Sequence, residues 1–115
     1  MAYSNTKRLA GKVAIITGSG RGIGRCEALL MAQQGAQVVV SDIGTDGEGA
    51  STAGKVAAEI RAAGGEAVSV TDSVATIAGA QRTVEQALQS YGRLDILVNN
   101  AGLRAGNPID KLTEE

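Results

Sequence analysis

A glycine-rich stretch at residues 17–24, called the glycine turn below, has the clearest chemical potential in the sequence. Glycine permits a tight turn and lets backbone N–H groups approach an anion, and a helix beginning there adds positive partial charge that suits a pyrophosphate. The glycine spacing is G-x-x-x-G-x-G and no Gly-Lys-Ser/Thr follows, so the stretch is not a nucleoside-triphosphate P-loop. The residues predicted to bind a cofactor here are Gly18, Ser19, Arg21, Gly22, Ile23 and Gly24.

Asp42 is the second candidate, because it ends an apolar run 24 residues after Gly18. An acidic residue about 20 residues beyond a phosphate-binding turn typically accepts hydrogen bonds from the hydroxyls of the adenosine ribose. The same carboxylate repels a 2′-phosphate. An Asp that only caps a loop is the alternative interpretation, but the glycine turn upstream favours the ribose role and therefore predicts NAD rather than NADP.

Further polar residues follow two later apolar runs. Taken singly they are ordinary turn residues, but ligands bind outside the carboxyl ends of the strands in an open α/β sheet. We therefore expect these residues to complete a cleft with the glycine turn. They are Asp72 and Ser73 after the third run, and Asn99, Ala101 and Gly102 after the fourth.

Four strand patterns, of which the third at residues 66–70 is short and mixed, and three helical patterns must position these residues. Continuous apolar runs predict strands buried on both faces, and helical spacing closed by glycine predicts helices. Right-handed crossovers then give an α/β, doubly wound parallel sheet in strand order 3-2-1-4. Residues 1–10 are expected as an arm that tucks Leu9 under the first strand, and 11–115 as the dinucleotide-binding half of a single domain, truncated at its C-terminus. The predicted strands are 13–17, 37–41, 66–70 and 94–98; the helices are 23–34, 55–63 and 76–91; residues 44–54 are a polar loop.

The composition excludes several functions. The 115 residues include no His, which excludes a His general base, a Ser/His/Asp triad and a His-bound metal. Cys26 is the only cysteine, so a disulfide within the chain and a Cys-based zinc site are excluded, and it is expected as a small buried helix residue. The net charge of −1 predicts no nucleic-acid partner, and the absence of a long apolar run predicts a soluble, cytoplasmic protein without a membrane segment.

The residues named so far, with Tyr91-Gly-Arg-Leu-Asp-Ile-Leu-Val-Asn-Asn-Ala-Gly102, resemble the short-chain dehydrogenase/reductase family over residues 9–115. The resemblance implies a Rossmann-type fold, NAD as cofactor and hydride transfer with a secondary alcohol or ketone, in a protein that is a homo-oligomer when complete. It assigns the phosphates to the glycine turn, the adenosine ribose to Asp42, the adenine to Asp72, and the nicotinamide-side ribose to Asn99, Ala101 and Gly102. A narrower similarity, in residues 42–44, 59–65 and 72–74, is to the hydroxyacyl-coenzyme A dehydrogenase branch.

The sequence departs from the family in two ways. Ser73 replaces the usual Val, and the family's later Asn, Ser and Tyr-x-x-x-Lys do not occur in these 115 residues. Tyr91 is followed four residues later by Asp95 rather than by Lys, so no catalytic residue is assigned. We therefore expect the chain alone to be truncated, inactive and prone to aggregate through residues 94–98 and the apolar stripe of Ile77, Val84 and Leu88.

Two other functions remain open from the residues. An S-adenosylmethionine methyltransferase also has a glycine turn after its first strand, but an acidic residue is favoured where this chain has Thr17, and residues 99–102 stay unexplained. A non-catalytic dinucleotide-sensing module needs no Tyr-x-x-x-Lys and is the other alternative.

Overall fold

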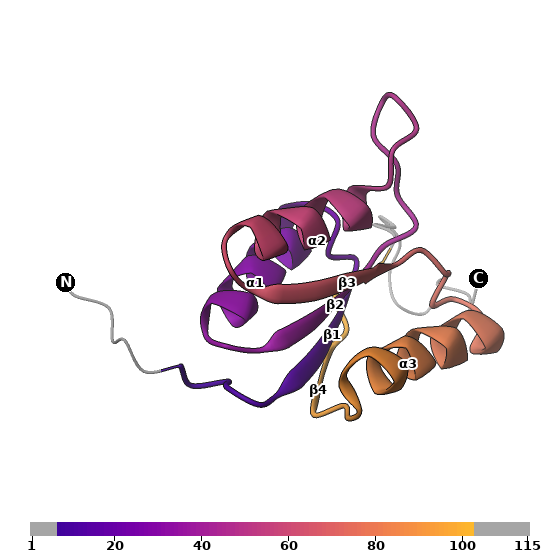
Figure 1. Ribbon diagram of the computed structural model, residues 1–115. Helices are drawn as coiled ribbons and strands as arrows, with labels where there is room; N and C mark the ends of the chain where they lie inside the picture. Colours follow the sequence, from indigo (N-terminus) through magenta and orange to yellow (C-terminus); the bar gives the residue numbers. More distant parts are fainter. Residues whose placement is uncertain (1–6, 103–115) are drawn as a thin grey trace, which may run out of the picture.

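The computed structural model describes residues 7–102, which form one parallel sheet with helices on both faces (Figure 1). The strand order is β3-β2-β1-β4, so the predicted order is confirmed. The elements in chain order are β1 (Val13–Thr17), α1 (Gly22–Gln33), β2 (Gln37–Ser41), α2 (Thr52–Ala62), β3 (Glu66–Val70), α3 (Ile77–Tyr91) and β4 (Ile96–Val98).

The core lies in two layers, one on each face of the sheet. On one face α1 and α2 cover Ile16, Val38 and Val40, while α3 covers Val13 and Ile15 on the other. Successive residues of β1 therefore serve opposite layers, and every residue of this strand is buried. This two-sided burial explains why β1 is a continuous apolar run. Leu9 packs against the layer that contains α1, as expected of the arm.

Two elements begin more than one residue away from their predicted starts. α2 begins at Thr52 because the Ser51 side chain accepts a hydrogen bond of 3.0 Å from the Gly54 amide and caps the helix. β4 begins only at Ile96. Just before it, an Asp95 carboxylate oxygen accepts the hydrogen bond of the Val13 amide at 2.9 Å, and in a continued strand a backbone carbonyl would accept that bond. The predicted loop at 44–54 is therefore shorter, and its end belongs to a helix.

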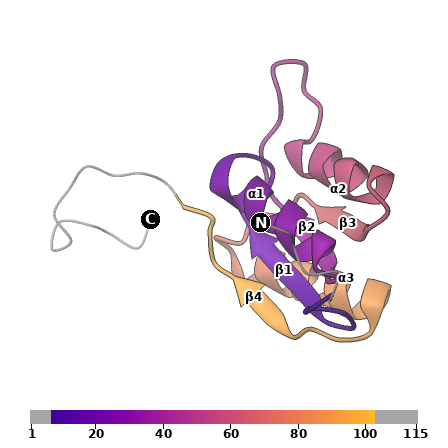
Figure 2. The same ribbon diagram turned by 90° about the vertical axis from the view of Figure 1, so that its left-hand side faces the viewer.

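Among the described residues, β4 is an edge strand that pairs with β1 alone (Figure 2). Its register places Leu97 opposite Ile15 and hence on the α3 face, where Leu97 is 55% exposed. On the same face of the sheet, α3 buries Gly79, Thr83 and Ala87 but leaves the stripe of Ile77, Val84 and Leu88 exposed. Within residues 7–102, no helix combines the length and the apolar character that crossing a bilayer demands. The sequence also predicts the start of a helix at residues 113–115, which lie outside the described residues.

Candidate nucleotide-binding site

The glycine turn joins β1 to α1 at the carboxyl edge of the sheet, where the parallel strands end. Gly18 and Gly22 have φ values of 66° and 60°, which glycine adopts without strain. A Cβ on Gly18 would lie 2.8 Å from Ala101 Cα, and one on Gly24 would lie 2.3 Å from the Gly18 carbonyl oxygen. Two of the glycines thus allow α1 and the segment after β4 to approach the turn closely.

The amino end of α1 differs from those of the other two helices. Its N-cap residue, Arg21, makes no side-chain capping bond. By contrast, α2 and α3 are capped by Ser51 and Thr76, each accepting a backbone N–H at 3.0 Å. No side chain therefore caps the first N–H groups of α1, which can donate to an anion and add the favourable helix dipole.

Asp42 faces the glycine turn from the end of β2 and is half-buried. One carboxylate oxygen accepts the Gly20 amide at 2.9 Å and the other accepts the Gly44 amide at 2.8 Å. Two backbone donors therefore orient the carboxylate. Because each carboxylate oxygen accepts more than one hydrogen bond, capacity is left for the two hydroxyls of a ribose.

Ser19 is placed differently from a residue that contacts a cofactor through its side chain. Its hydroxyl is completely buried, donates to the Ile16 carbonyl at 2.6 Å and accepts the Ser41 amide at 3.1 Å. Its own amide also donates to the Ser41 carbonyl at 3.0 Å. The Ser19 side chain therefore fastens the glycine turn to the end of β2, and only its backbone lies along the turn.

Sequence reasoning missed Thr17 and Asn100, which fasten the segment after β4 to the glycine turn. The Thr17 hydroxyl accepts the amides of Asn100 and Ala101, both at 3.0 Å, and the Asn100 side chain donates to the Gly18 carbonyl at 3.1 Å. Asn99, which was chosen from the sequence, is exposed. The sequence feature that could have identified Asn100 is the pair of adjacent asparagines. Neighbouring side chains in an extended segment point to opposite sides, so only one of the two can reach the glycine turn.

The remaining predicted residues are spread along the carboxyl edge. Asp72 follows β3 and accepts a hydrogen bond of 2.9 Å from Arg82 on α3, and Ser73 accepts the Ala75 amide at 3.2 Å. Their side chains are thus engaged with α3 and its preceding turn. The residues exposed at this edge are Arg21, Gly22, Ile23, Asn99, Ala101 and Gly102.

The expectation that Cys26 is buried was wrong. Its side chain is exposed, because the buried face of α1 is formed by Gly24, Ala28 and Ala32 at a spacing of four residues. A residue midway between two of these positions points away from the sheet. Cys26 therefore contributes nothing to the core.

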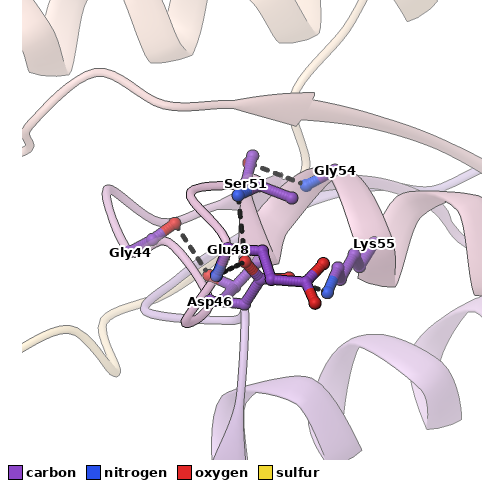
Figure 3. A network of polar contacts seen from close by, with 8 residues as sticks. Gly44, Asp46, Glu48, Ser51, Gly54 and Lys55 are labelled. Carbon is purple, nitrogen blue, oxygen red and sulfur yellow. Dashed lines mark hydrogen bonds and ion pairs between the residues drawn. The ribbon is translucent and has the colours of Figure 1, made fainter.

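The connection between β2 and α2 contains a hairpin, residues 44–51, that stands out from the body of the molecule above α2 (Figure 1). Asp46 organises it: one carboxylate oxygen accepts the Glu48 and Ala50 amides at 2.8 and 3.0 Å, and the other pairs with Lys55 on α2 (Figure 3). The Lys55 ammonium and the two amides lower the pKa of Asp46 to about 2. The hairpin contains two glycines beyond Gly44, but the hydrogen bonds and the ion pair of the Asp46 side chain hold it in one conformation.

We expect Asp46→Asn to loosen the hairpin most above about pH 4 and progressively less as the pH falls through about 2. Because the pKa of Asp46 is lowered from 3.8 to about 2 by folding, its contribution is complete above the unfolded value and is lost as the pH falls through the folded one. Hydrogen exchange of the Glu48 and Ala50 amides in both proteins measures the difference. A gap between wild type and variant that does not shrink between about pH 4 and about pH 2 would contradict the assignment.

Comparisons with known proteins agree with this geometry. The family model described as short chain dehydrogenase matches residues 12–115. Peroxisomal multifunctional enzyme type 2 of Drosophila melanogaster is 49% identical, over 100% of this chain and 20% of its own length. A short chain dehydrogenase from Mycobacterium avium has a TM-score of 0.81 at 44% identity, covering 92% of this chain and 38% of that one. A hydroxysteroid dehydrogenase from Escherichia coli has a TM-score of 0.79 at 40% identity, covering 92% and 43%. The chain thus spans less than half the length of each of these three relatives.

Proposed function

The chain belongs to the short-chain dehydrogenase family, and on that premise we propose that it is the NAD-binding portion of an oxidoreductase. The complete protein would transfer hydride between NAD(H) and a secondary alcohol or its ketone. The relatives include enzymes named as dehydrogenases, which supports a small-molecule substrate oxidised or reduced at carbon. Their names do not agree on one substrate, so the proposal stays at the level of the alcohol and ketone class.

The observation that carries the proposal is the oriented carboxylate of Asp42. It is held by the amides of Gly20 and Gly44 beside the glycine turn, and it retains acceptor capacity for the 2′- and 3′-hydroxyls of an adenosine ribose. A 2′-phosphate in the same place would meet a negative charge, which favours NAD over NADP.

The other groups at the carboxyl edge fit the rest of a dinucleotide. The uncapped amides at the start of α1 would hold the pyrophosphate, and the exposed segment of Asn99, Ala101 and Gly102 would lie on the nicotinamide side. Asp72 would contact the adenine through the oxygen that Arg82 does not use. When bound, the nicotinamide ring supplies the hydride chemistry, and the described residues bind and orient the molecule.

We further propose that residues 11–115 are the first part of a longer dehydrogenase domain. Leu97 of β4 and Val84 and Leu88 of α3 are exposed apolar side chains, and a further strand beside β4 with its helix would cover them. The proton acceptor for the alcohol would come from that part, because Tyr91 lies at the amino edge of the sheet, away from Asp42. We also propose that the complete protein forms a homo-oligomer. Its cytoplasmic location stays a prediction, because the Drosophila relative is named as peroxisomal.

Isothermal titration of the whole protein with NAD, NADP and S-adenosylmethionine tests the proposal. We expect NAD to bind roughly ten- to a hundredfold more tightly than NADP, the difference that one hydrogen bond to a charged group makes, and no binding of S-adenosylmethionine. A panel of secondary alcohols with NAD should then yield NADH absorbance, whereas residues 1–115 alone should yield none. Binding of S-adenosylmethionine alone, or equal affinity for NAD and NADP, would overturn the assignment.

A further inference from the structure

We infer that Thr52, the first residue of α2, is a positioning residue that orients Asp42 and thereby sets the preference between NAD and NADP. The inference rests on the proposed function and deepens it, because it assigns the preference to the start of α2 as well as to the carboxylate itself. Thr52 lies ten residues beyond Asp42, on the far side of the hairpin.

The first step is the contact between Thr52 and Gly44. The Thr52 amide and the Thr52 hydroxyl both donate to the Gly44 carbonyl, each at 3.1 Å. The amide of the same Gly44 donates to Asp42 at 2.8 Å. Thr52 thus joins the two ends of the hairpin at Gly44, the residue whose amide binds the Asp42 carboxylate.

The second step is the packing of Thr52 against the glycine turn. A Cβ added to Gly20 would lie 2.2 Å from the Thr52 hydroxyl oxygen and 2.9 Å from an Asp42 carboxylate oxygen. Only glycine therefore fits at position 20, because Thr52 and Asp42 occupy the space where a side chain would lie. The Gly20 amide donates to that same Asp42 oxygen at 2.9 Å, and the Gly44 amide donates to the other at 2.8 Å. Thr52 therefore lies against both residues whose amides hold the carboxylate.

The consequence concerns the direction of the carboxylate. With Thr52 in place, the two amide donors fix the Asp42 oxygens relative to the glycine turn, where the ribose of the cofactor would lie. Without the Thr52 hydroxyl, the Gly44 carbonyl keeps one donor of two, and the Gly44 amide becomes less well placed. Discrimination should then fall while phosphate binding by the amides at the start of α1 is retained.

The experiment compares Thr52→Val, which removes the hydroxyl and keeps the shape, with Thr52→Ser, which keeps the hydroxyl. Titration of the whole protein gives the ratio of the Kd for NADP to the Kd for NAD. We expect this ratio to fall about three- to tenfold in Thr52→Val, the effect of one hydrogen bond, and to stay near wild type in Thr52→Ser. In an Asp42→Ala background Thr52→Val should not change the ratio further, because no carboxylate is left to orient.

A second readout needs no nucleotide. Hydrogen exchange of the Gly20 and Gly44 amides should become faster in Thr52→Val and not in Thr52→Ser. Unchanged exchange at both amides, or a ratio that shifts equally with and without the Asp42 carboxylate, would overturn the inference. A wild-type protein that binds neither nucleotide would instead refute the proposed function, and the exchange rates would still decide whether Thr52 positions Asp42.

Discussion

Gly24→Ala should weaken NAD binding by roughly ten- to a hundredfold and destabilise the fold by about 1–3 kcal/mol, the usual cost of overpacking. The added Cβ would lie 2.3 Å from the Gly18 carbonyl oxygen and 2.6 Å from the Asn100 side-chain nitrogen. The first of these atoms belongs to the backbone of the glycine turn and cannot move alone. Relief of the clash shifts the start of α1 away from the turn, so at least one amide donor to the pyrophosphate is misplaced.

Gly54→Ala is the matched control, because it adds the same methyl group to another helical glycine. A Cβ at Gly54 would lie 3.5 Å from the Ser51 side chain, an ordinary contact, and the Gly54 amide would still donate to its cap. Alanine in a helix is favoured over glycine by up to about 1 kcal/mol, so we expect a small gain in stability and unchanged NAD affinity. Urea unfolding and NAD titration of both variants measure the contrast. Equal behaviour of the two would show that the close approach at Gly24 is unimportant.

Asp42→Ala should abolish the preference for NAD and lower NAD affinity by roughly ten- to a hundredfold, through loss of the hydrogen bonds from the ribose hydroxyls. Two backbone donors, the amides of Gly20 and Gly44, would lose their acceptor at the same time. Part of the loss of affinity will therefore come from loosening of the glycine turn. NADP affinity should rise relative to that of NAD, because the repulsion of the 2′-phosphate is removed.

Two further variants separate the effect of charge from that of positioning. Asp42→Asn keeps one acceptor oxygen for the backbone amides but removes the negative charge, so it should lose discrimination with a smaller loss of stability. Asp46→Asn removes a carboxylate from the same connection, at a place that pairs with Lys55, and should leave the ratio of the two affinities unchanged. Titration of all three variants with NAD and NADP measures this. If Asp42→Ala and Asp42→Asn both kept the wild-type ratio, Asp42 would not be the ribose acceptor.

The positions of the strands, their order and the place of the candidate site were determined by local pattern. The runs at 13–17, 37–41 and 66–70 match the observed strands because β-branched and apolar residues bounded by glycine favour buried extended backbone. Right-handed crossovers then leave few possible orders, and the carboxyl ends of the strands must meet at one edge. The glycine turn and Asp42 could therefore be placed together before any contact was known.

Only the tertiary structure decided what each polar group at this edge touches. Whether Ser19 faces outward, and whether Asn99 or Asn100 reaches the glycine turn, depends on hydrogen bonds to partners 22 or more residues away, such as Ser41 and Gly18. Residue type and spacing carry no signal for such partners, because a serine or asparagine in a turn can bond locally, to solvent or across the fold. The same holds for Thr52, whose place against Gly20 arises only when α2 packs beside the glycine turn.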